Sequence, residues 1–284
     1  MSTKKVAVVG LGTMGAGIAQ VAAQSGLQVL GVERDAAAVA AAHGRVSAGL
    51  DRLVKRDKLS AADRDSALDR LRIGTDMDAV GDADVVIEAV FEDVEGKKAL
   101  FANLDRLASP DAVLASNTST IPLVILAAAT VRPERVIGLH FFNPVPMMKL
   151  VEVIRTPAAD PAAVEAGRQL AVDLGKSPVL INDVPGFVGN LLVVPYLLDA
   201  IRAYERNVAE MAAIDDVIKL GFNHPMGPFA LADLIGLDIV HDMAVSMYEE
   251  YKDPKFFPPP LLKQYVRMGW LGRKTGRGFY TYDR

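Results

Sequence analysis

The 284-residue sequence contains no cysteine, and neither charge is in strong excess. Without cysteine the chain has no disulfides, thiolate metal ligands or cysteine nucleophile, so any redox chemistry needs a bound cofactor. The same absence favours a reducing compartment, and we expect the cytoplasm. A net charge of −4 provides no basic field for nucleic acid and no polybasic membrane anchor. We therefore expect neither nucleic acid nor membrane as a partner.

Long apolar runs are also missing. No segment approaches the roughly twenty apolar residues that a membrane-spanning helix needs. The opening residues, MSTKKVAVVG, pass from two lysines directly into a short apolar run, without the longer stretch and cleavage site of a signal peptide. No metal site is predicted.

The first half of the chain alternates short β-rich runs with longer helical patterns. This alternation is typical of a parallel sheet wrapped by crossover helices. The charged, Ala-rich segment 36–72 is helical in period and too long for one crossover, so it predicts two antiparallel helices projecting from the sheet. Candidate strands occupy residues 5–10, 28–33, 84–90, 113–117, 135–141 and 149–155.

The pattern changes near Pro185. From Phe187 onward it is helical, interrupted at GFNHPMGP and PKFFPPP, with no internal repeat and no low-complexity linker. The sequence thus predicts a doubly wound α/β domain over residues 1–184, packed with an all-α domain over residues 185–284.

Three glycines directly after the first predicted strand form a nucleotide-binding fingerprint. Gly10, Gly12 and Gly15 give G-x-G-x-x-G, with Thr13 and Met14 inside the motif. Glycine clusters also serve ordinary turns. Here, however, strand, glycines, helix and second strand follow in the order of a dinucleotide-binding Rossmann unit. The glycines let the backbone approach a pyrophosphate, whose charge sits at the helix N-terminus.

Glu33 ends the second predicted strand, about twenty residues after the first glycine, where the motif places an acid. A carboxylate there accepts hydrogen bonds from the adenosine ribose and repels the extra phosphate of NADP, so the sequence predicts NAD. The neighbouring Arg34 leaves NADP open, because an arginine at this place can accommodate a 2′-phosphate. Alternatively, Arg34 is simply a solvated surface side chain.

Residues 137–153 carry one ionisable side chain in each of two strand-like apolar runs, His140 and Glu152, on either side of a Pro-rich reversal. A histidine oriented by a carboxylate can move a proton near neutral pH. A histidine in an apolar stretch is more often a satisfied core residue, and Glu152 could be a surface charge on an edge strand. The setting LVEVI argues against that alternative, because an unpaired carboxylate among buried neighbours is costly.

With these features together, the chain resembles the L-3-hydroxyacyl-CoA dehydrogenase family over essentially its whole length, and looks most like the bacterial 3-hydroxybutyryl-CoA dehydrogenase members. The order and spacing of the matching segments make the resemblance specific. These segments are VVGLGTMGAGIAQVAA, VIEAVFEDVEGKKALFANLD, LASNTSTIPL, GLHFFNPVPMMKLVEVI, PGFVGNLLVVPYLLDA, GFNHPMGPFALADLIGLDIV and GRKTGRGFYTY.

The resemblance implies a role for individual residues. His140 would be the proton-transfer base and Glu152 its orienting partner, with Ser119 and Asn190 in contact with the substrate. As single residues, Ser119 and Asn190 could equally be helix caps. The remaining implied cofactor contacts are Glu92, Lys97, Asn117 and Asn143, although Glu92 and Lys97 could be only the charged start of a helix and Asn143 a turn residue.

Coenzyme A brings phosphates to a chain that is acidic overall. Arg52, Lys55 and Arg56 lie one to four residues apart, partly on one helical face, and such a stretch is usually only solvated. In the family, however, the projecting helices close over coenzyme A, so the resemblance implies that these three residues bind the acyl-CoA.

The resemblance implies an enzyme that interconverts (S)-3-hydroxyacyl-CoA and 3-oxoacyl-CoA, most readily the four-carbon pair, with NAD. Two alternatives stay open, a sugar-acid dehydrogenase on the same scaffold and a non-catalytic, crystallin-like NAD-binding protein. The apolar segments 191–201 and 226–240 carry more hydrophobic surface than a small domain hides, which predicts a homodimer through the C-terminal domain. Acyl chain length and the physiological direction are left open.

Overall fold

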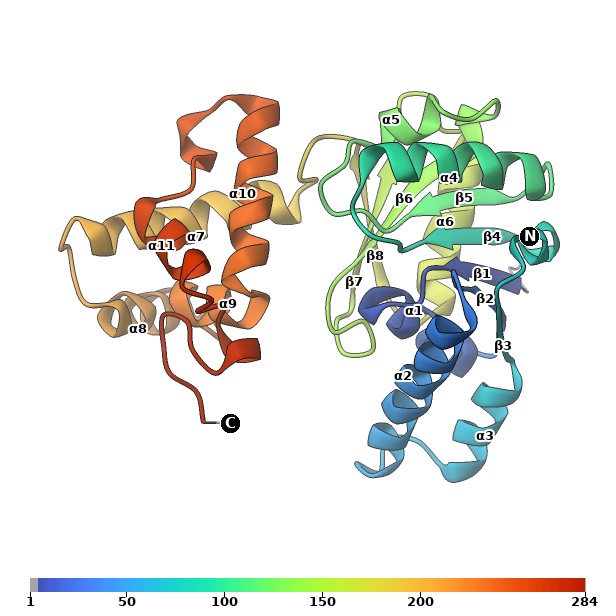
Figure 1. Cartoon of the computed structure of the whole chain (residues 1–284), viewed down its shortest axis with the longest axis horizontal. Helices are drawn as coiled ribbons and strands as arrows, with labels where there is room; N and C mark the ends of the chain where they lie inside the picture. The colour runs from blue at the N-terminus through green and yellow to red at the C-terminus, as the bar shows by residue number, and fades with distance from the viewer. Residues whose placement is uncertain (1–4, 284) are drawn as a thin grey trace. The chain divides into compact units, whose positions relative to one another are not determined.

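The computed structural model of the chain describes residues 5–283. The chain forms two compact units, one ending at Val184 and the other beginning at Pro185. Figure 1 shows a sheet covered by helices in the first unit and a group of helices in the second. Within residues 5–283, no helix is both long and apolar enough to span a bilayer.

The first unit contains an eight-stranded sheet in the order β3-β2-β1-β4-β5-β6-β7-β8. Neighbours from β3 to β6 are parallel, β7 runs antiparallel to β6, and β8 is parallel to β7. The order 3-2-1-4-5-6 is that of the Rossmann fold, so the predicted fold class is confirmed. The strands are β1 (Lys5–Val9), β2 (Gln28–Val32), β3 (Leu71–Gly74), β4 (Val85–Glu88), β5 (Val113–Ser116), β6 (Val136–Phe141), β7 (Leu150–Arg155) and β8 (Ser177–Asn182).

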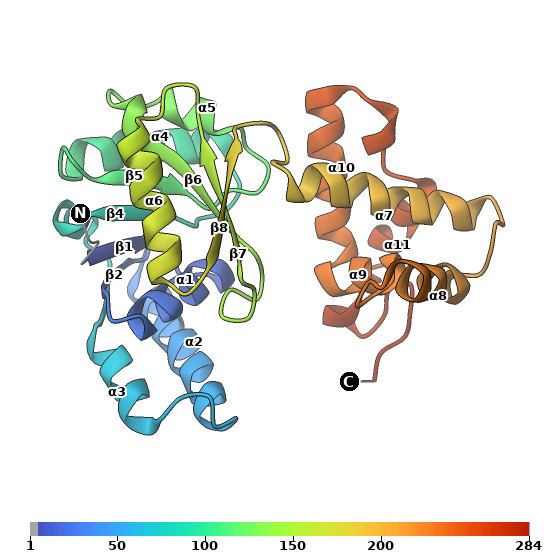
Figure 2. The same ribbon diagram turned by 180° about the vertical axis from the view of Figure 1, so that it is seen from behind.

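Helices cover both faces of this sheet. The long helix α4 lies in front of the strands in Figure 1, and α6 lies in front of them in the reverse view of Figure 2. A continuous apolar core joins α1, α2 and α6 to one face, because inward side chains of the strands interdigitate with Ile18, Val46 and Leu170. The helices are α1 (Thr13–Gln24), α2 (Ala36–Val54), α3 (Ala61–Asp69), α4 (Val94–Leu107), α5 (Leu123–Ala127) and α6 (Pro161–Asp173).

The projecting pair is α2 and α3, and each begins at a side-chain cap. Asp35 accepts the N–H of Ala38, and Ser60 accepts that of Asp63. The predicted end of this pair at residue 72 is wrong, because α3 stops at Asp69 and residues 71–74 form the edge strand β3. The strand β8 was also missed by sequence reasoning. Glu152 therefore does not lie on an edge, since β7 has a strand on each side.

The second unit is helical apart from isolated bridges near its end. Val194, Leu197, Phe229, Val240 and Phe256 form its apolar core. Two buried carboxylates organise this unit: Asp215 accepts backbone N–H groups at the start of α9, and Asp233 accepts those of the C-terminal segment. The helices are α7 (Gly189–Glu205), α8 (Met211–Phe222), α9 (Pro228–Ile235), α10 (Leu237–Tyr251) and α11 (Pro260–Arg267).

Candidate active site

Of the three fingerprint glycines, Gly10 and Gly12 lie in the turn between β1 and α1 and Gly15 lies in the first turn of α1, and each contributes differently. Gly10 has a positive φ of +83°, and a Cβ there would lie 2.8 Å from the side chain of Val90. A Cβ on Gly15 would lie 1.9 Å from the carbonyl oxygen of Gly10, so α1 packs directly on the end of the strand. A Cβ on Gly12 would meet no atom within 4 Å, which leaves backbone open to a ligand.

Glu33 directly follows β2 at the same edge of the sheet. One carboxylate oxygen accepts the backbone N–H of Leu11 at 2.6 Å, which fixes the side chain beside the glycine turn. Arg34 instead points its guanidinium at Asp35, 3.1 Å away, and remains 86% exposed. This arrangement of a glycine turn, a helix N-terminus and a fixed acid fits a dinucleotide whose adenosine ribose carries no 2′-phosphate. NAD recognition rests on this geometry.

His140 and Glu152 are direct partners in the register of β6 and β7, so their side chains leave the same face of the sheet. Nδ1 of His140 lies 2.7 Å from Oε2 of Glu152, and both side chains are buried. The ring of Phe142 packs 4.7 Å from the imidazole. A carboxylate on Nδ1 fixes the ring and leaves Nε2 as the atom for proton transfer.

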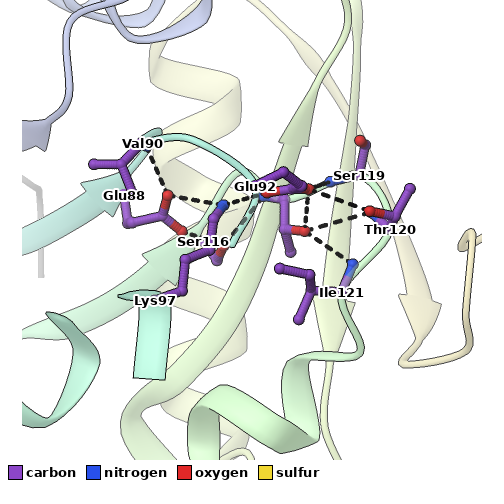
Figure 3. A network of polar contacts seen from close by, with 9 residues as sticks. Glu88, Val90, Glu92, Lys97, Ser116, Ser119, Thr120 and Ile121 are labelled. Carbon is purple, nitrogen blue, oxygen red and sulfur yellow. Dashed lines mark hydrogen bonds and ion pairs between the residues drawn. The ribbon is translucent and has the colours of Figure 1, made fainter. Parts of the chain in front are cut away.

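A chain of polar contacts runs from the core to the surface beyond the ends of β4 and β5 (Figure 3). Lys97, only 1% exposed, lies 2.9 Å from Glu88 and 2.5 Å from Glu92. Glu88 is fully buried and also accepts the hydroxyl of Ser116 and the N–H of Val90. We call Glu88, Lys97 and Glu92 the buried triad. The ammonium of Lys97 lies between the two carboxylates, and the predicted contact of Lys97 with the cofactor stays a prediction.

Glu92 supports the loop that carries Ser119. Its carboxylate accepts the hydroxyl of Thr118 at 2.5 Å and the backbone N–H of Ser119 at 2.9 Å. Burial raises the pKa of Glu92, but the charge and hydrogen bond of Lys97, together with these donors, outweigh it and leave the pKa lowered. Glu92 is therefore ionised at neutral pH and holds the loop beside the end of β5.

Ser119 and Asn190 do not occupy the capping positions of α5 and α7. The first N–H groups of α5 are bound by the carboxylate of Asp183, rather than by Ser119. Asn190 is buried in the first turn of α7 in the second unit, after the capping position at Val188. Asn117 has a structural contact, since its side-chain oxygen accepts the N–H of Phe141 at 3.0 Å.

A groove of about 620 Å³ lies between α1, α2 and the loop that follows β6. Its wall is made mainly of small residues, and Thr13 and Asn143, both predicted cofactor contacts, line it. Gly44 lies within α2, and a Cβ there would meet no atom within 4 Å. The groove can therefore accept a narrow ligand close to the helix backbone.

Of the predicted coenzyme A contacts, Arg52 lines this groove, whereas Lys55 and Arg56 do not. The three residues were expected to lie partly on one helical face, but α2 ends at Val54, so of the three only Arg52 lies within the helix. Sequence reasoning missed Arg45, which also lines the groove and donates to the carbonyl of Leu11 at 3.1 Å. Its spacing of seven residues from Arg52, two turns on one helical face, was the available signal.

Glu88 was also missed. An acid at the end of the apolar run VVIE signals a buried partner, because an ionised side chain there must be compensated. The compensating Lys97 lies nine residues later, on α4, and its own sequence context is an ordinary charged helix start. Only the tertiary structure shows the two together.

Comparisons with known proteins match both units of the chain. The family model described as "3-hydroxyacyl-CoA dehydrogenase, NAD binding domain" matches residues 5–184, and the model of the C-terminal domain of the same enzyme matches residues 186–282. The chain is 48% identical over 281 residues to a 3-hydroxybutyryl-CoA dehydrogenase of Mycobacterium tuberculosis, with 98% of each chain covered.

Two further relatives agree. The chain is 44% identical over 283 residues to a probable 3-hydroxybutyryl-CoA dehydrogenase of Bacillus subtilis, covering 100% of this chain and 99% of the relative. A crystal structure of (S)-3-hydroxybutyryl-CoA dehydrogenase from Ralstonia eutropha superposes with a TM-score of 0.95 at 43% identity, with both chains fully covered.

Proposed function

The chain belongs to the 3-hydroxyacyl-CoA dehydrogenase family, and from that premise we propose that it interconverts (S)-3-hydroxybutyryl-CoA and acetoacetyl-CoA with NAD. The observation that carries the proposal is the buried His140–Glu152 pair, 2.7 Å apart. This pair lies near the carboxyl end of β6, and the glycine turn follows the carboxyl end of β1. Carboxyl ends of parallel strands meet at one edge of the sheet, where such folds bind their ligands.

NAD, when bound, accepts or returns the hydride at the substrate's third carbon. His140 takes the hydroxyl proton through Nε2 during oxidation and returns it during reduction. Glu152 holds Nδ1 and stabilises the imidazolium while His140 carries the proton. Burial of both side chains keeps water away from this exchange.

NAD would be held by the glycine turn and by Glu33. The backbone around Gly12 and the start of α1 face the pyrophosphate, and no side chain among the described residues caps that helix. Glu33 accepts the adenosine ribose hydroxyls. Glu92 supports the Ser119 loop on the other side of β1, and Asn143 lies in the wall of the groove.

The groove beside α2 supports a coenzyme A thioester as the substrate class. Arg45 and Arg52 supply positive charge along a wall made mainly of small residues, which suits a thin arm that ends in phosphates. Lys55 and Arg56 are exposed just past the end of α2 and can add charge for the same phosphates. Ser119 and Asn190 are proposed to hold the acyl end, Ser119 through its hydroxyl and Asn190 through its amide.

We also propose a homodimer that forms through the second unit. On α8 the apolar side chains Val217, Leu220 and Phe222 are 63%, 84% and 68% exposed, and only Asp215 of this helix is buried. Val217 and Leu220, three residues apart, lie on one face of α8, and an exposed apolar face of this kind is typical of a surface that a second copy covers. Segments 191–201 and 226–240 were predicted from the sequence for this contact. Segment 191–201 buries most of its apolar side chains in the unit's own core.

The cysteine-free composition supports a reducing compartment, and we propose the cytoplasm.

The decisive experiment mixes the protein with NADH and acetoacetyl-CoA and follows the loss of nicotinamide absorbance. We expect turnover with the four-carbon substrate and a far slower reaction with NADPH. Turnover of a sugar acid in place of the thioester would overturn the proposed substrate. Binding of NADH without turnover of any substrate would instead support a non-catalytic protein.

A further inference from the structure

The buried triad carries an unbalanced charge. Lys97 lies between two carboxylates, 2.9 Å from Glu88 and 2.5 Å from Glu92 (Figure 3), so one positive charge faces two negative ones. The hydroxyl groups of Ser116 and Thr118 donate hydrogen bonds to these carboxylates but bring no charge. With both acids ionised, the triad has a net charge of −1.

Water screens the negative charge of the triad poorly at the buried end, where Glu88 lies. The side chains of Glu88 and Lys97 are 0% and 1% exposed, whereas that of Glu92 is 33% exposed. A fully buried carboxylate interacts with its surroundings through an effective dielectric far below that of water, so its field extends beyond its direct contacts. A structural role alone requires one carboxylate for Lys97, and the second makes the cluster negative.

The strand order places the triad relative to a dinucleotide. Glu33 follows β2, the glycine turn follows β1, and the triad lies at the carboxyl end of β4, whose last residue is Glu88, in that spatial order along one edge. A dinucleotide whose adenosine ribose is at Glu33 and whose pyrophosphate is at the glycine turn therefore extends its nicotinamide half toward the triad.

We propose that the net negative charge of the buried triad strengthens the binding of oxidised NAD relative to that of reduced NADH. This inference rests on the proposed function, in which NAD is the cofactor. The oxidised nicotinamide ring carries a positive charge that the reduced ring lacks. The pyrophosphate, ribose and adenine are the same in both forms, so their contacts cancel in the ratio of the two dissociation constants. Glu88, which is fully buried, thus acts on the cofactor through its charge rather than through a contact.

The test measures dissociation constants of NAD+ and NADH by titration calorimetry for the unmodified protein and for Glu88→Gln. Glutamine keeps the shape and can still accept the N–H of Val90, while the triad becomes neutral. We expect NAD+ binding to weaken relative to NADH by roughly three- to tenfold, the order expected for one poorly screened charge on the order of 10 Å from the ring. Glu92→Gln removes the same charge from the exposed end and should shift the ratio in the same direction by less.

The matched control is Glu95→Gln on the same helix, α4. It removes one negative charge whose side chain is 80% exposed and pairs with Lys98, so solvent screens it and the ratio should stay constant. Glu33→Gln should weaken both cofactor forms equally.

A merely structural triad would weaken both forms together. An unchanged ratio in both Glu88→Gln and Glu92→Gln, or a shift that favours NAD+, would therefore overturn the inference. If Glu88→Gln does not fold, Glu92→Gln decides alone. Failure of the unmodified protein to bind either cofactor form would overturn the proposed function, and this inference with it. Binding of both forms without turnover of acetoacetyl-CoA would contradict only the proposed reaction.

Discussion

His140 and Glu152 face each other across an antiparallel strand pair, with Nδ1 of the imidazole 2.7 Å from Oε2 of the carboxylate. The position is set by backbone register rather than by a flexible loop, and both strands lie inside the sheet. The register fixes the face from which both side chains project, and the contact with Glu152 together with the packing of Phe142 orients the imidazole ring. This geometry supports the proposed role of the pair as a pre-organised proton-transfer site.

We expect His140→Asn to abolish most turnover while it leaves NADH binding unchanged. The asparagine amide can still donate to Glu152, so the buried carboxylate keeps a partner, but the atom equivalent to Nε2 is lost. The turnover number should fall by about 10²- to 10⁴-fold, the usual contribution of a general acid–base group. Steady-state rates with acetoacetyl-CoA and NADH fluorescence titration measure the two effects. Turnover within a few-fold of the unmodified protein would remove His140 from the mechanism.

Gly44 gives a prediction for the groove beside α2. A glycine inside a helix costs about 1 kcal/mol relative to alanine, so Gly44→Ala should raise the free energy of unfolding. The added methyl group enters the groove, and we expect the KM for acetoacetyl-CoA to rise roughly fivefold or more, with a larger effect for Gly44→Val. Urea unfolding and steady-state kinetics measure the two effects.

The control for this prediction is a truncated substrate, the acetoacetyl thioester of N-acetylcysteamine, which lacks the nucleotide arm. Its kinetics should be unaffected by Gly44→Ala. Ala40→Ser, an exposed change on α2 outside the groove, should alter neither substrate. An equal loss with both thioesters, or none with acetoacetyl-CoA, would show that the nucleotide arm does not use this groove.

The apolar face of α8 leads to a prediction about assembly. Leu220→Asp places a charge on a side chain that is 84% exposed in the single chain, so it should cost little in folding but prevent a second copy from covering the face. We expect sedimentation at micromolar concentration to show a dimer for the unmodified protein and a monomer for this variant. Val131→Asp, at an 88% exposed position of the first unit, should remain dimeric. A monomeric unmodified protein would contradict the proposed homodimer.

The central strands could be predicted from the sequence because they are continuous apolar runs; in β4 and β6 every residue is buried. The outer strands β3 and β8 could not be predicted in this way. Their apolar runs are short: LRIG in β3 has two aliphatic side chains and SPVLIN in β8 has three, and of these only Leu71 is buried. An outer strand is recognised through its neighbour, which the local sequence does not contain.

The candidate site shows the same limit. The fingerprint glycines and Glu33 could be predicted because their geometry is local and follows one strand–turn–helix unit. The spacing of His140 and Glu152 around a reversal indicated proximity, but only the register places them on one face. Lys97 was assigned to the cofactor from the family resemblance. Its burial between Glu88 and Glu92 depends on other elements, and no local pattern reveals those partners.

Asp233 and the C-terminal segment predict how stability depends on alkaline pH. The carboxylate accepts the hydroxyl of Tyr282 at 2.9 Å; burial and this hydrogen bond raise the pKa of Tyr282 to about 12. Burial and Asp215 also raise the pKa of Tyr280. An unfolded tyrosine ionises near pH 10, so between about pH 10 and about 12 the folded chain retains protons that the unfolded chain has lost. The free energy of unfolding must then fall as the pH rises through this range.

Urea unfolding followed by circular dichroism should show this fall, and Tyr282→Phe should make it shallower while it leaves the slope between pH 7 and 9 unchanged. Equal slopes above pH 10 in the two proteins would show that this tyrosine does not couple protonation to folding.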